Sequence, residues 1–326
     1  MKRLLDRPYL LPLKSTQTTA TDTESAKRIE AKRRFVEGAL RGETTDDQEA
    51  TFASYVNDLQ LATLEQSAGG ISLATEALAH CPTVRDLELG DDVYFDDMRP
   101  FVEALAKNTT LHKLHIHNCC FEFDLGTPLE QLAEGIAGSH LKTLVLEYAD
   151  DSPDPVQGTA SCSGLAALGK SLSAHESLEC LHITFQHMSA LQVESLAAGL
   201  LRNHTLTRLT LQSDTAGVML PMVLALSRGA LPQLEHLALI ACDEGSTVSV
   251  RELAALSRVL EKHKTLRSVQ LAPQYLVPEA IDTIADGLAM SRTITSLRPH
   301  PLVTPWTIPP AIWAILQRNR GRDARF

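Results

Sequence analysis

Apolar residues recur along most of this chain in one frame, L-x-x-L-x-L-x-x-[N/C]-x-φ, where φ is any apolar residue. We call the first apolar position of the frame its anchor. The anchors fall at Val84, Leu111, Leu141, Leu178, Leu206, Leu234, Leu266 and Ile294, with a weaker copy at Val56. Counting from Val56, successive anchors are 28, 27, 30, 37, 28, 28, 32 and 28 residues apart. This spacing predicts one structural unit copied many times along the chain.

Each unit contains two different hydrophobic periods. Within the frame, apolar and polar residues alternate, as in Leu114-His115-Ile116, and this predicts a short half-buried strand. Before most anchors, apolar residues are spaced by three and four, which places them on one face of a helix. These trios are Ile71/Ala74/Leu78, Met98/Phe101/Leu105, Leu165/Leu168/Leu172, Val193/Leu196/Leu200, Leu253/Leu256/Leu260 and Ile281/Ile284/Leu288. Each unit is therefore predicted to run strand, loop, helix, loop.

Neither the strand nor the helix of one unit can bury its apolar side alone, so neighbouring units must stack to form the core. A period near 28 residues with this frame is typical of a leucine-rich repeat. We therefore expect an α/β fold, a right-handed leucine-rich repeat solenoid shaped like a horseshoe. Parallel strands would line its concave face and helices its convex face.

Four segments are predicted along the chain: a disordered N-terminal segment (1–22), a helical N-terminal cap (23–54), the repeats (55–300) and a C-terminal cap (301–326). Seven of the eleven residues from Ser15 to Ser25 are Ser or Thr, which favours disorder. The capping-box pattern from Thr21 to Glu24 predicts a helix that ends near Arg41. Around Val56 the residues fit either a helix or a repeat strand, and the sequence does not separate the two.

The C-terminal cap is predicted to contain a short helix, Ala311 to Arg318. Its residues Ile312, Trp313, Ile315 and Leu316 would close the core. Two units carry extra residues, at Ala149–Gly158 and near Asp243–Thr247. Insertions in solenoids occur in loops, which are either binding elements or tolerated surface variation.

Two segments of the chain resemble a known class of repeat. Leu105–Ile116 and Leu200–Leu211 both read Leu-x-[Lys/Arg]-Asn-x-Thr-Leu-x-[Lys/Arg]-Leu-x-[Ile/Leu]. They resemble the helix end, Asn-containing turn and strand of ribonuclease-inhibitor-like leucine-rich repeats, and the resemblance covers about residues 55 to 320. It implies the fold described above. For function it implies only a binding protein, because the class includes inhibitors, ubiquitin-ligase receptors, immune receptors and pathogen effectors.

The N-terminal region has a second resemblance. A Ser/Thr-rich start followed by a basic helix (Lys27, Arg28, Lys32, Arg33, Arg34) and divergent repeats is similar to bacterial type III secreted effectors. That resemblance implies delivery into a host cell, where the repeats would act on host proteins. The alternative is a substrate-recognition adaptor of a ubiquitin ligase, although residues 1–50 contain no convincing F-box pattern.

Composition and charge exclude several classes of function. A net charge of −10 with no basic stripe among the repeats argues against nucleic-acid binding. No run of eighteen apolar residues is present, and Asp6, Arg7 and Pro8 interrupt the apolar N-terminus, so neither a membrane span nor a signal peptide is expected.

The six cysteines form no CxxC pattern, and Cys119 and Cys242 stand at the ninth position of the frame, where the side chain turns inward. Reduced thiols suit this role, so a cytoplasmic location is expected. We also expect the chain to be a monomer.

Little in the sequence suggests catalysis. His115 and His117 lie two residues apart on a predicted strand, with His112 and His182 as possible neighbours. A metal site needs a third ligand and supporting contacts, and a solvated polar strand face accounts for these histidines better. No G-x-S-x-G, P-loop or dinucleotide motif occurs. We expect no catalytic residue, no metal ion and no cofactor, and a metal-dependent enzyme is the least favoured hypothesis.

The third, fifth and seventh positions of each frame predict the residues that face the concavity. These are Asp86, Glu88, Lys113, His115, His117, Thr143, Val145, Glu147, His182, Thr184, Arg208, Thr210, Gln212, His236 and Ile240. The residues expected to bind a partner protein are Glu88, Lys113, His115, His117, Glu147, Tyr148, His182, Phe185, Arg208 and His236.

Tyr148 and Phe185 are predicted to be adjacent aromatics at one rim of the concave face, and buried aromatics dominate many interfaces. The alternative is that both pack beneath the loop that follows Ala149. The histidines predict binding that changes between about pH 5.5 and about pH 7.5, the range around the ordinary histidine pKa.

Overall fold

The computed structural model describes residues 20–43, 49–95, 97–118, 120–121, 126–148, 162–215, 217–241, 248–272, 275–299 and 308–323. The expected disordered segment up to residue 19, both insertions and the side chains of Cys119 and Cys242 lie outside these residues. Residues 20–22, which the sequence assigned to that segment, belong to a helix instead.

Helices and strands alternate through the described residues. The helices are α1 (Ala20–Leu40), α2 (Glu49–Asp58), α3 (Ser72–His80), α4 (Met98–Lys107), α5 (Gly126–Gly138), α6 (Cys162–Ser173), α7 (Ala190–Leu200), α8 (Leu220–Ser227), α9 (Val250–Lys262), α10 (Pro278–Met290) and α11 (Pro310–Asp323). The strands are β1 (Thr63–Gly70), β2 (Asp86–Phe95), β3 (Lys113–His117), β4 (Cys120–Phe121), β5 (Thr143–Tyr148), β6 (Cys180–Phe185), β7 (Arg208–Ser213), β8 (His236–Ala241), β9 (Ser268–Leu271) and β10 (Ser296–Pro299).

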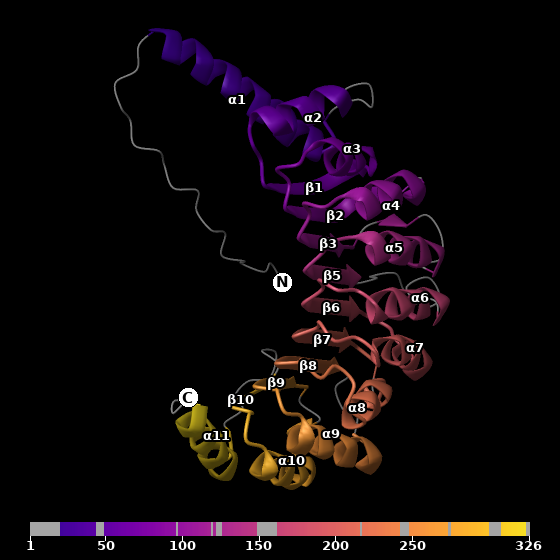
Figure 1. The fold of residues 1–326 in the computed structure, drawn as a ribbon, viewed down its shortest axis with the longest axis vertical. Helices are drawn as coiled ribbons and strands as arrows, with labels where there is room; N and C mark the ends of the chain where they lie inside the picture. The colour runs from indigo at the N-terminus through magenta and orange to yellow at the C-terminus, as the bar shows by residue number, and fades with distance from the viewer. Residues whose placement is uncertain are drawn as a thin grey trace.

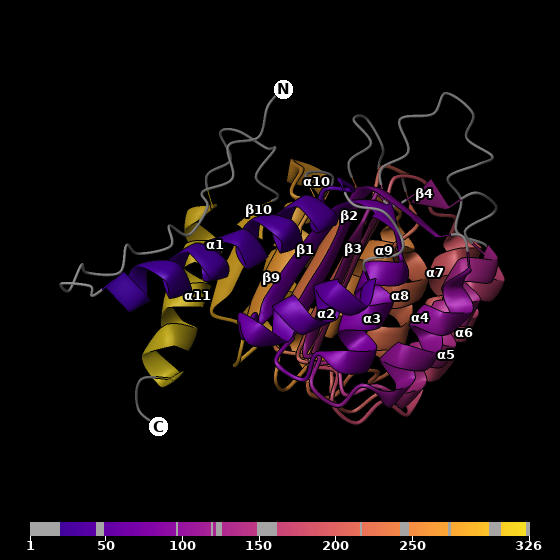
Figure 2. The ribbon, with the colours of Figure 1, turned by 90° about the horizontal axis from the view of Figure 1, so that it is seen from above.

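All of the described strands belong to one parallel sheet. Its order follows the chain, β1-β2-β3-β5-β6-β7-β8-β9-β10, and the short β4 pairs with β2. The sheet curves, with the strands on the inner side and helices α3 to α10 on the outer side (Figure 1). Seen from above, strands and helices form two layers side by side (Figure 2). The chain is therefore an α/β leucine-rich repeat solenoid, as its sequence predicts.

The anchors form the centre of the core. All eight from Val84 to Ile294 are at most 1% exposed. The helix trios pack against them from the outer layer, and each of their residues is buried or partly buried against the core. Register carries this pattern from unit to unit, because Leu114 pairs with Leu87 on one side and Leu144 on the other. Apolar positions four and six therefore stack in continuous rows between the two layers.

A polar residue three positions before the anchor closes the turn between helix and strand in several units. Asn108 Oδ1 accepts hydrogen bonds from the backbone N–H groups of Thr110 and Leu111 at 2.9 and 2.7 Å. Its Nδ2 donates to the carbonyl of Leu78, in the helix of the preceding unit, at 2.7 Å. Asn203 makes the same set of contacts. These side chains satisfy buried backbone groups that would otherwise be costly.

The first repeat strand lies later than the weak frame at Val56 predicts. Val56 is fully buried in α2, so the helical interpretation of this stretch is confirmed. Thr63 pairs with Asp86, which makes Leu61 the anchor of this unit. Its sixth position is Gln66, which is completely buried and donates hydrogen bonds to the carbonyls of Ala68 and Gly70. Because a polar residue occupies this core position, the hydrophobic pattern did not identify this repeat.

The C-terminal helix α11 covers the C-terminal end of the row of repeats. Ile312 and Leu316 are fully buried, and Asn319 Nδ2 donates to the carbonyl of Ile294 at 2.8 Å. Trp313 does not close the core as expected. It is 47% exposed, with the Arg320 guanidinium 5.5 Å from its ring. None of the described helices combines the length and apolar character that crossing a membrane requires.

Candidate functional site

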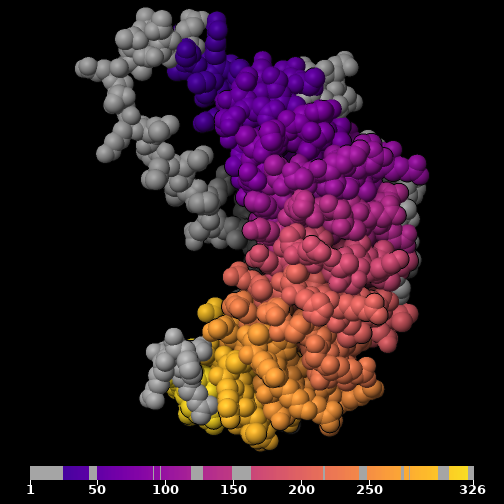
Figure 3. Space-filling model, viewed as in Figure 1, coloured from indigo at the N-terminus to yellow at the C-terminus, as the bar shows by residue number. Residues whose placement is uncertain are grey.

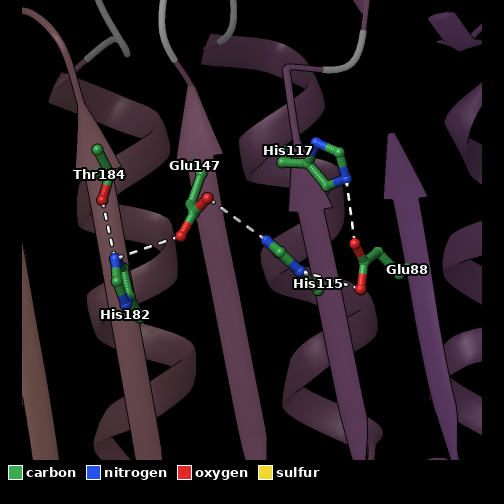
Figure 4. Close-up of polar contacts among 6 residues, drawn as sticks. All are labelled: Glu88, His115, His117, Glu147, His182 and Thr184. Atoms are coloured by element: carbon green, nitrogen blue, oxygen red, sulfur yellow. Dashed lines mark hydrogen bonds and ion pairs between the residues drawn. The ribbon is translucent and has the colours of Figure 1, made fainter. Parts of the chain in front are cut away.

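A network of histidine and glutamate side chains crosses four consecutive strands of the concave face (Figure 4). We call Glu88, His115, His117, Glu147 and His182 the His–Glu array. The frame places these residues at positions five and seven of β2, β3, β5 and β6. Because the strands are in register, Glu88 is the direct neighbour of His115, and His117 of Glu147.

His115 lies between two carboxylates. Its Nδ1 is 3.4 Å from Glu88 Oε2, and its Nε2 is 3.6 Å from Glu147 Oε2. The side chain is only 17% exposed, and Nε2 itself is buried without a hydrogen-bond partner, so its attraction to Glu147 is mainly electrostatic. Burial opposes the charged imidazolium, but Glu147 and Glu88 together outweigh it and raise the pKa of His115.

The other two histidines each flank one carboxylate. His117 Nε2 lies 3.3 Å from Glu88 Oε1, and His182 Nε2 lies 3.5 Å from Glu147 Oε1. Thr184 Oγ1, at 2.9 Å from His182 Nε2, is a further hydrogen-bond partner for that ring. Burial lowers the pKa of His182 despite the attraction of Glu147. The close imidazole of His115 lowers the pKa of Glu147, and the charges of His182 and His117 lower it further.

Gly90 makes room for the His117 ring. A Cβ at Gly90 would lie 3.2 Å from His117 Cε1 and 3.3 Å from Nε2, closer than almost all ordinary contacts. The glycine stands at position seven of β2, where the frame elsewhere places a larger residue. A side chain there would push His117 away from Glu88.

The array does not form a metal site. Within the ranges that the structure describes, no group of three or more His, Cys, Asp or Glu side chains is arranged to hold a metal ion. Each imidazole points at a carboxylate on the next strand (Figure 4), so the array forms a chain of pairs rather than converging on one point.

The remaining predicted partner-binding residues lie on either side of the array. Lys113 is half-buried at position three of β3. Arg208 and His236 pair in register on β7 and β8, towards the C-terminal end. Burial lowers the pKa of His236, and the positive charges of Arg208, Arg267 and Arg298 lower it further.

Two residues, Phe185 and Ile240, differ from the expected exposed positions. Tyr148 and Phe185 are register partners, but Phe185 is 3% exposed and belongs to the hydrophobic core. Tyr148 is partly buried against that core. Ile240 is also buried, at 4% exposed. The expectation of exposed aromatics at the rim is therefore corrected for Phe185, because position eight of β6 turns into the core.

Sequence reasoning did not include two charged residues of the concave face. Glu65 was missed because the first frame was set at Val56 rather than Leu61, and it pairs with Glu88 at position five. Arg298 stands at position five of β10, paired with Gln270, and is exposed. Extending the frame to every unit would have found both.

Comparisons with known proteins add little to this description. No family model matches the chain, and no curated protein matches it. Among solved structures, leiomodin-1 actin-binding site 2 is similar with 14% identity and a TM-score of 0.31, covering 53% of this chain and 86% of that one. Internalin C2 from Listeria monocytogenes is similar with 17% identity and a TM-score of 0.33, covering 68% and 74% respectively. At these scores neither likeness bears on function, and the fold assignment rests on the repeated units themselves.

Proposed function

We propose that this chain is a protein-interaction scaffold that binds a partner protein across its concave face. The observation that carries the proposal is the His–Glu array, whose side chains are 17–40% exposed on the inner face of a curved sheet. The space-filling view shows the molecule hollowed on one side, between its N-terminal and C-terminal ends (Figure 3). A surface of this shape offers many aligned polar groups to one partner.

The proposed contact residues are the array together with Lys113, Tyr148, Arg208 and His236. Phe185 is left out because it is buried. The array is suited to fixing orientation and specificity rather than to supplying most of the affinity, since charged pairs at interfaces act mainly in that way. Tyr148 is the aromatic residue that could contribute affinity at the edge of the array.

Delivery into a host cell and recruitment to a ubiquitin ligase are not part of this proposal. The ligase hypothesis rests on residues 1–50, and the delivery hypothesis rests on the same region together with the divergence of the repeats. Residues 1–19 and 44–48 lie outside the described residues. The proposal concerns the repeats, where the concave face is described on every strand from β1 to β10 except β4.

Photo-crosslinking tests where the partner binds. A benzoylphenylalanine at Thr143, on the concave face of β5, should crosslink the partner, whereas the same residue at the exposed Ala198 of α7 should not. The variant Glu147→Ala with His182→Ala should weaken binding of the captured partner by about tenfold, roughly 1.4 kcal/mol. Its Tm should remain almost unchanged, because partly exposed ion pairs contribute only about 0–1 kcal/mol to stability.

A matched variant separates a specific effect from a general one. Glu194→Ala with His204→Ala removes the same two residue types from exposed positions outside the concave face and should leave binding unchanged. Affinity for the captured partner should also differ between about pH 5.5 and about pH 7.5, because the ordinary histidine pKa lies in that range. Crosslinking from Ala198 alone would show that the concave face is not the interface.

A further inference from the structure

Charge is divided along the concave face. At positions three, five and seven of β1, β2, β3, β5 and β6, four residues are acidic (Glu65, Asp86, Glu88, Glu147) and Lys113 is the one lysine or arginine. At the described positions three, five and seven of β7 to β10, Arg208 and Arg298 are the charged residues, and none is acidic. We call the first set the acidic end and the two arginines the basic end.

The carboxylates of the acidic end are only partly neutralised. Glu88 and Glu147 pair with imidazoles, which carry a charge only when protonated, rather than with lysine or arginine. Asp86 accepts a weak hydrogen bond from Thr63, at 3.5 Å, and Glu65 is exposed. This end of the face therefore keeps most of its negative charge.

The basic end also keeps its charge. Arg208 and Arg298 are exposed, and among the described residues neither forms an ion pair. The positive charges of Arg208 and Arg298, together with that of Arg267, lower the pKa of His236 on β8. Glu235 is the acidic group that opposes them there.

The two ends lie far enough apart to contact different parts of one partner segment. Nine strands follow one another along the sheet. With about 4.8 Å between neighbouring strands, the face extends roughly 40 Å. An extended segment of about 12 residues spans that length.

We propose that the concave face binds a partner segment with the opposite division of charge, basic residues against the acidic end and acidic residues against the basic end. This inference rests on the proposed function and specifies the chemistry of its partner. A uniformly charged segment would be repelled at one end, because like charges brought together at an interface weaken binding. The division of charge thus specifies both the charge pattern of the partner segment and the direction in which it lies along the face.

Two synthetic peptides of identical composition test the proposal. A block peptide carries a run of lysines, a short Gly-Ser linker and an equal run of glutamates, whereas an alternating peptide distributes the same residues evenly. In fluorescence anisotropy with the full chain, the block peptide should bind at least about tenfold more tightly. Its affinity should fall as salt is raised, because exposed charges are screened.

Charge reversal at each end identifies the contacts. Glu65→Lys with Asp86→Lys should weaken the block peptide by about tenfold, and so should Arg208→Glu with Arg298→Glu. Glu261→Lys and Arg258→Glu, at exposed positions of α9, serve as controls and should have no effect. The neutral pair Glu65→Gln and Asp86→Asn should give a smaller loss in the same direction, which guards against an effect of misfolding.

Equal binding of the two peptides, or block-peptide binding that ignores both reversals, would overturn the charge-division proposal. If the partner still crosslinks to Thr143 in that case, the concave scaffold stands and only the partner's chemistry is wrong. If crosslinking from Thr143 also fails, the proposed function itself is wrong.

Discussion

In several repeats a single polar side chain closes the turn between the helix and the next strand. Histidine replaces the turn asparagine in two units, at His175 and His263. His175 Nδ1 accepts from the backbone N–H groups of Ser177 and Leu178, at 3.3 and 3.0 Å, as Asn108 Oδ1 does in its own turn. An imidazole can accept at Nδ1 only when that nitrogen carries no proton. The fold therefore selects the neutral form of His175.

This requirement predicts a loss of stability in acid. Burial lowers the pKa of His175, with the charge of His140 adding to that effect. A histidine whose folded pKa is depressed takes up protons more readily when unfolded. Its stabilising contribution is thus complete above the unfolded value of about 6.5 and is lost as the pH falls below it.

The variant His175→Asn tests this, because asparagine already fills the same position at Asn108 and Asn203. Urea unfolding at about pH 7.5 should show stability within about 1 kcal/mol of the parent chain, whereas His175→Ala should lose about 1–3 kcal/mol. On acidification to about pH 5.5 the parent should lose more stability than His175→Asn. Equal losses would mean that His175 is not held neutral.

Some adjacent helices pack so closely that only glycine fits at the point of contact. α6 and α7 meet at Gly169 and Gly199, where a Cβ on Gly199 would lie 2.1 Å from the Gly169 carbonyl carbon. Backbone cannot move aside as a flexible side chain can, so these two helices approach as closely as they do only because both residues lack a side chain. Gly287 of α10 similarly contacts the backbone of Ser257 in α9.

The substitution Gly199→Ala should therefore destabilise the chain, although alanine is the better helix former. Overpacking costs about 1–3 kcal/mol, which outweighs the roughly 1 kcal/mol gained in helix propensity. Gly321→Ala in α11 is the matched control, because nothing lies within 4 Å of its Cβ position. Thermal unfolding should show a lower Tm for the first variant and an equal or higher Tm for the second. A Tm for Gly199→Ala at or above the parent value would contradict the close helix contact.

At the scale of the whole molecule, the fold is a line of units that each contact their neighbours. Its ends are covered differently, with α1 and α2 at the N-terminal side and α11 against the last strand at the C-terminal side (Figure 1). In such arrays stability is approximately a sum of unit and interface contributions, so damage at one end should stay near that end.

Leu316→Asp tests this locality by placing a charge at a fully buried position of α11. Burying an unpaired charge is strongly destabilising, and α11 should detach from β10. Hydrogen exchange should increase in β9, β10 and α10 while β3, β5 and β6 keep their protection. Gln317→Asp, at the exposed neighbouring position, should change neither. A uniform increase in hydrogen exchange along the chain would show that all the repeats unfold together as one cooperative unit.

The sequence alone determined the repeat, because a solenoid is built from local patterns that lie within one unit. The anchors, the helix trios and the alternation that turns Glu88, His115 and Glu147 to one face all follow from spacing within about 28 residues of chain. Register then follows too, since equal frames pair position with position, as in His115 with Val145.

Only the tertiary structure decided what covers each residue and which polar atoms meet. Phe185 and Ile240 are buried, whereas their register partners at the same frame positions, Tyr148 and Gln212, are only partly buried, so the position in the frame does not by itself set the degree of burial. Gln66 at a core position kept a complete strand out of the hydrophobic pattern, and the hydrogen bonds that its Nε2 donates to Ala68 and Gly70 offset only part of the cost of burying a polar side chain. The pairing of each array histidine with a particular carboxylate likewise depends on side-chain direction and on the space above Gly90. Periodicity encodes the face on which a residue lies, whereas the packing of neighbouring units determines its contacts and its charge state.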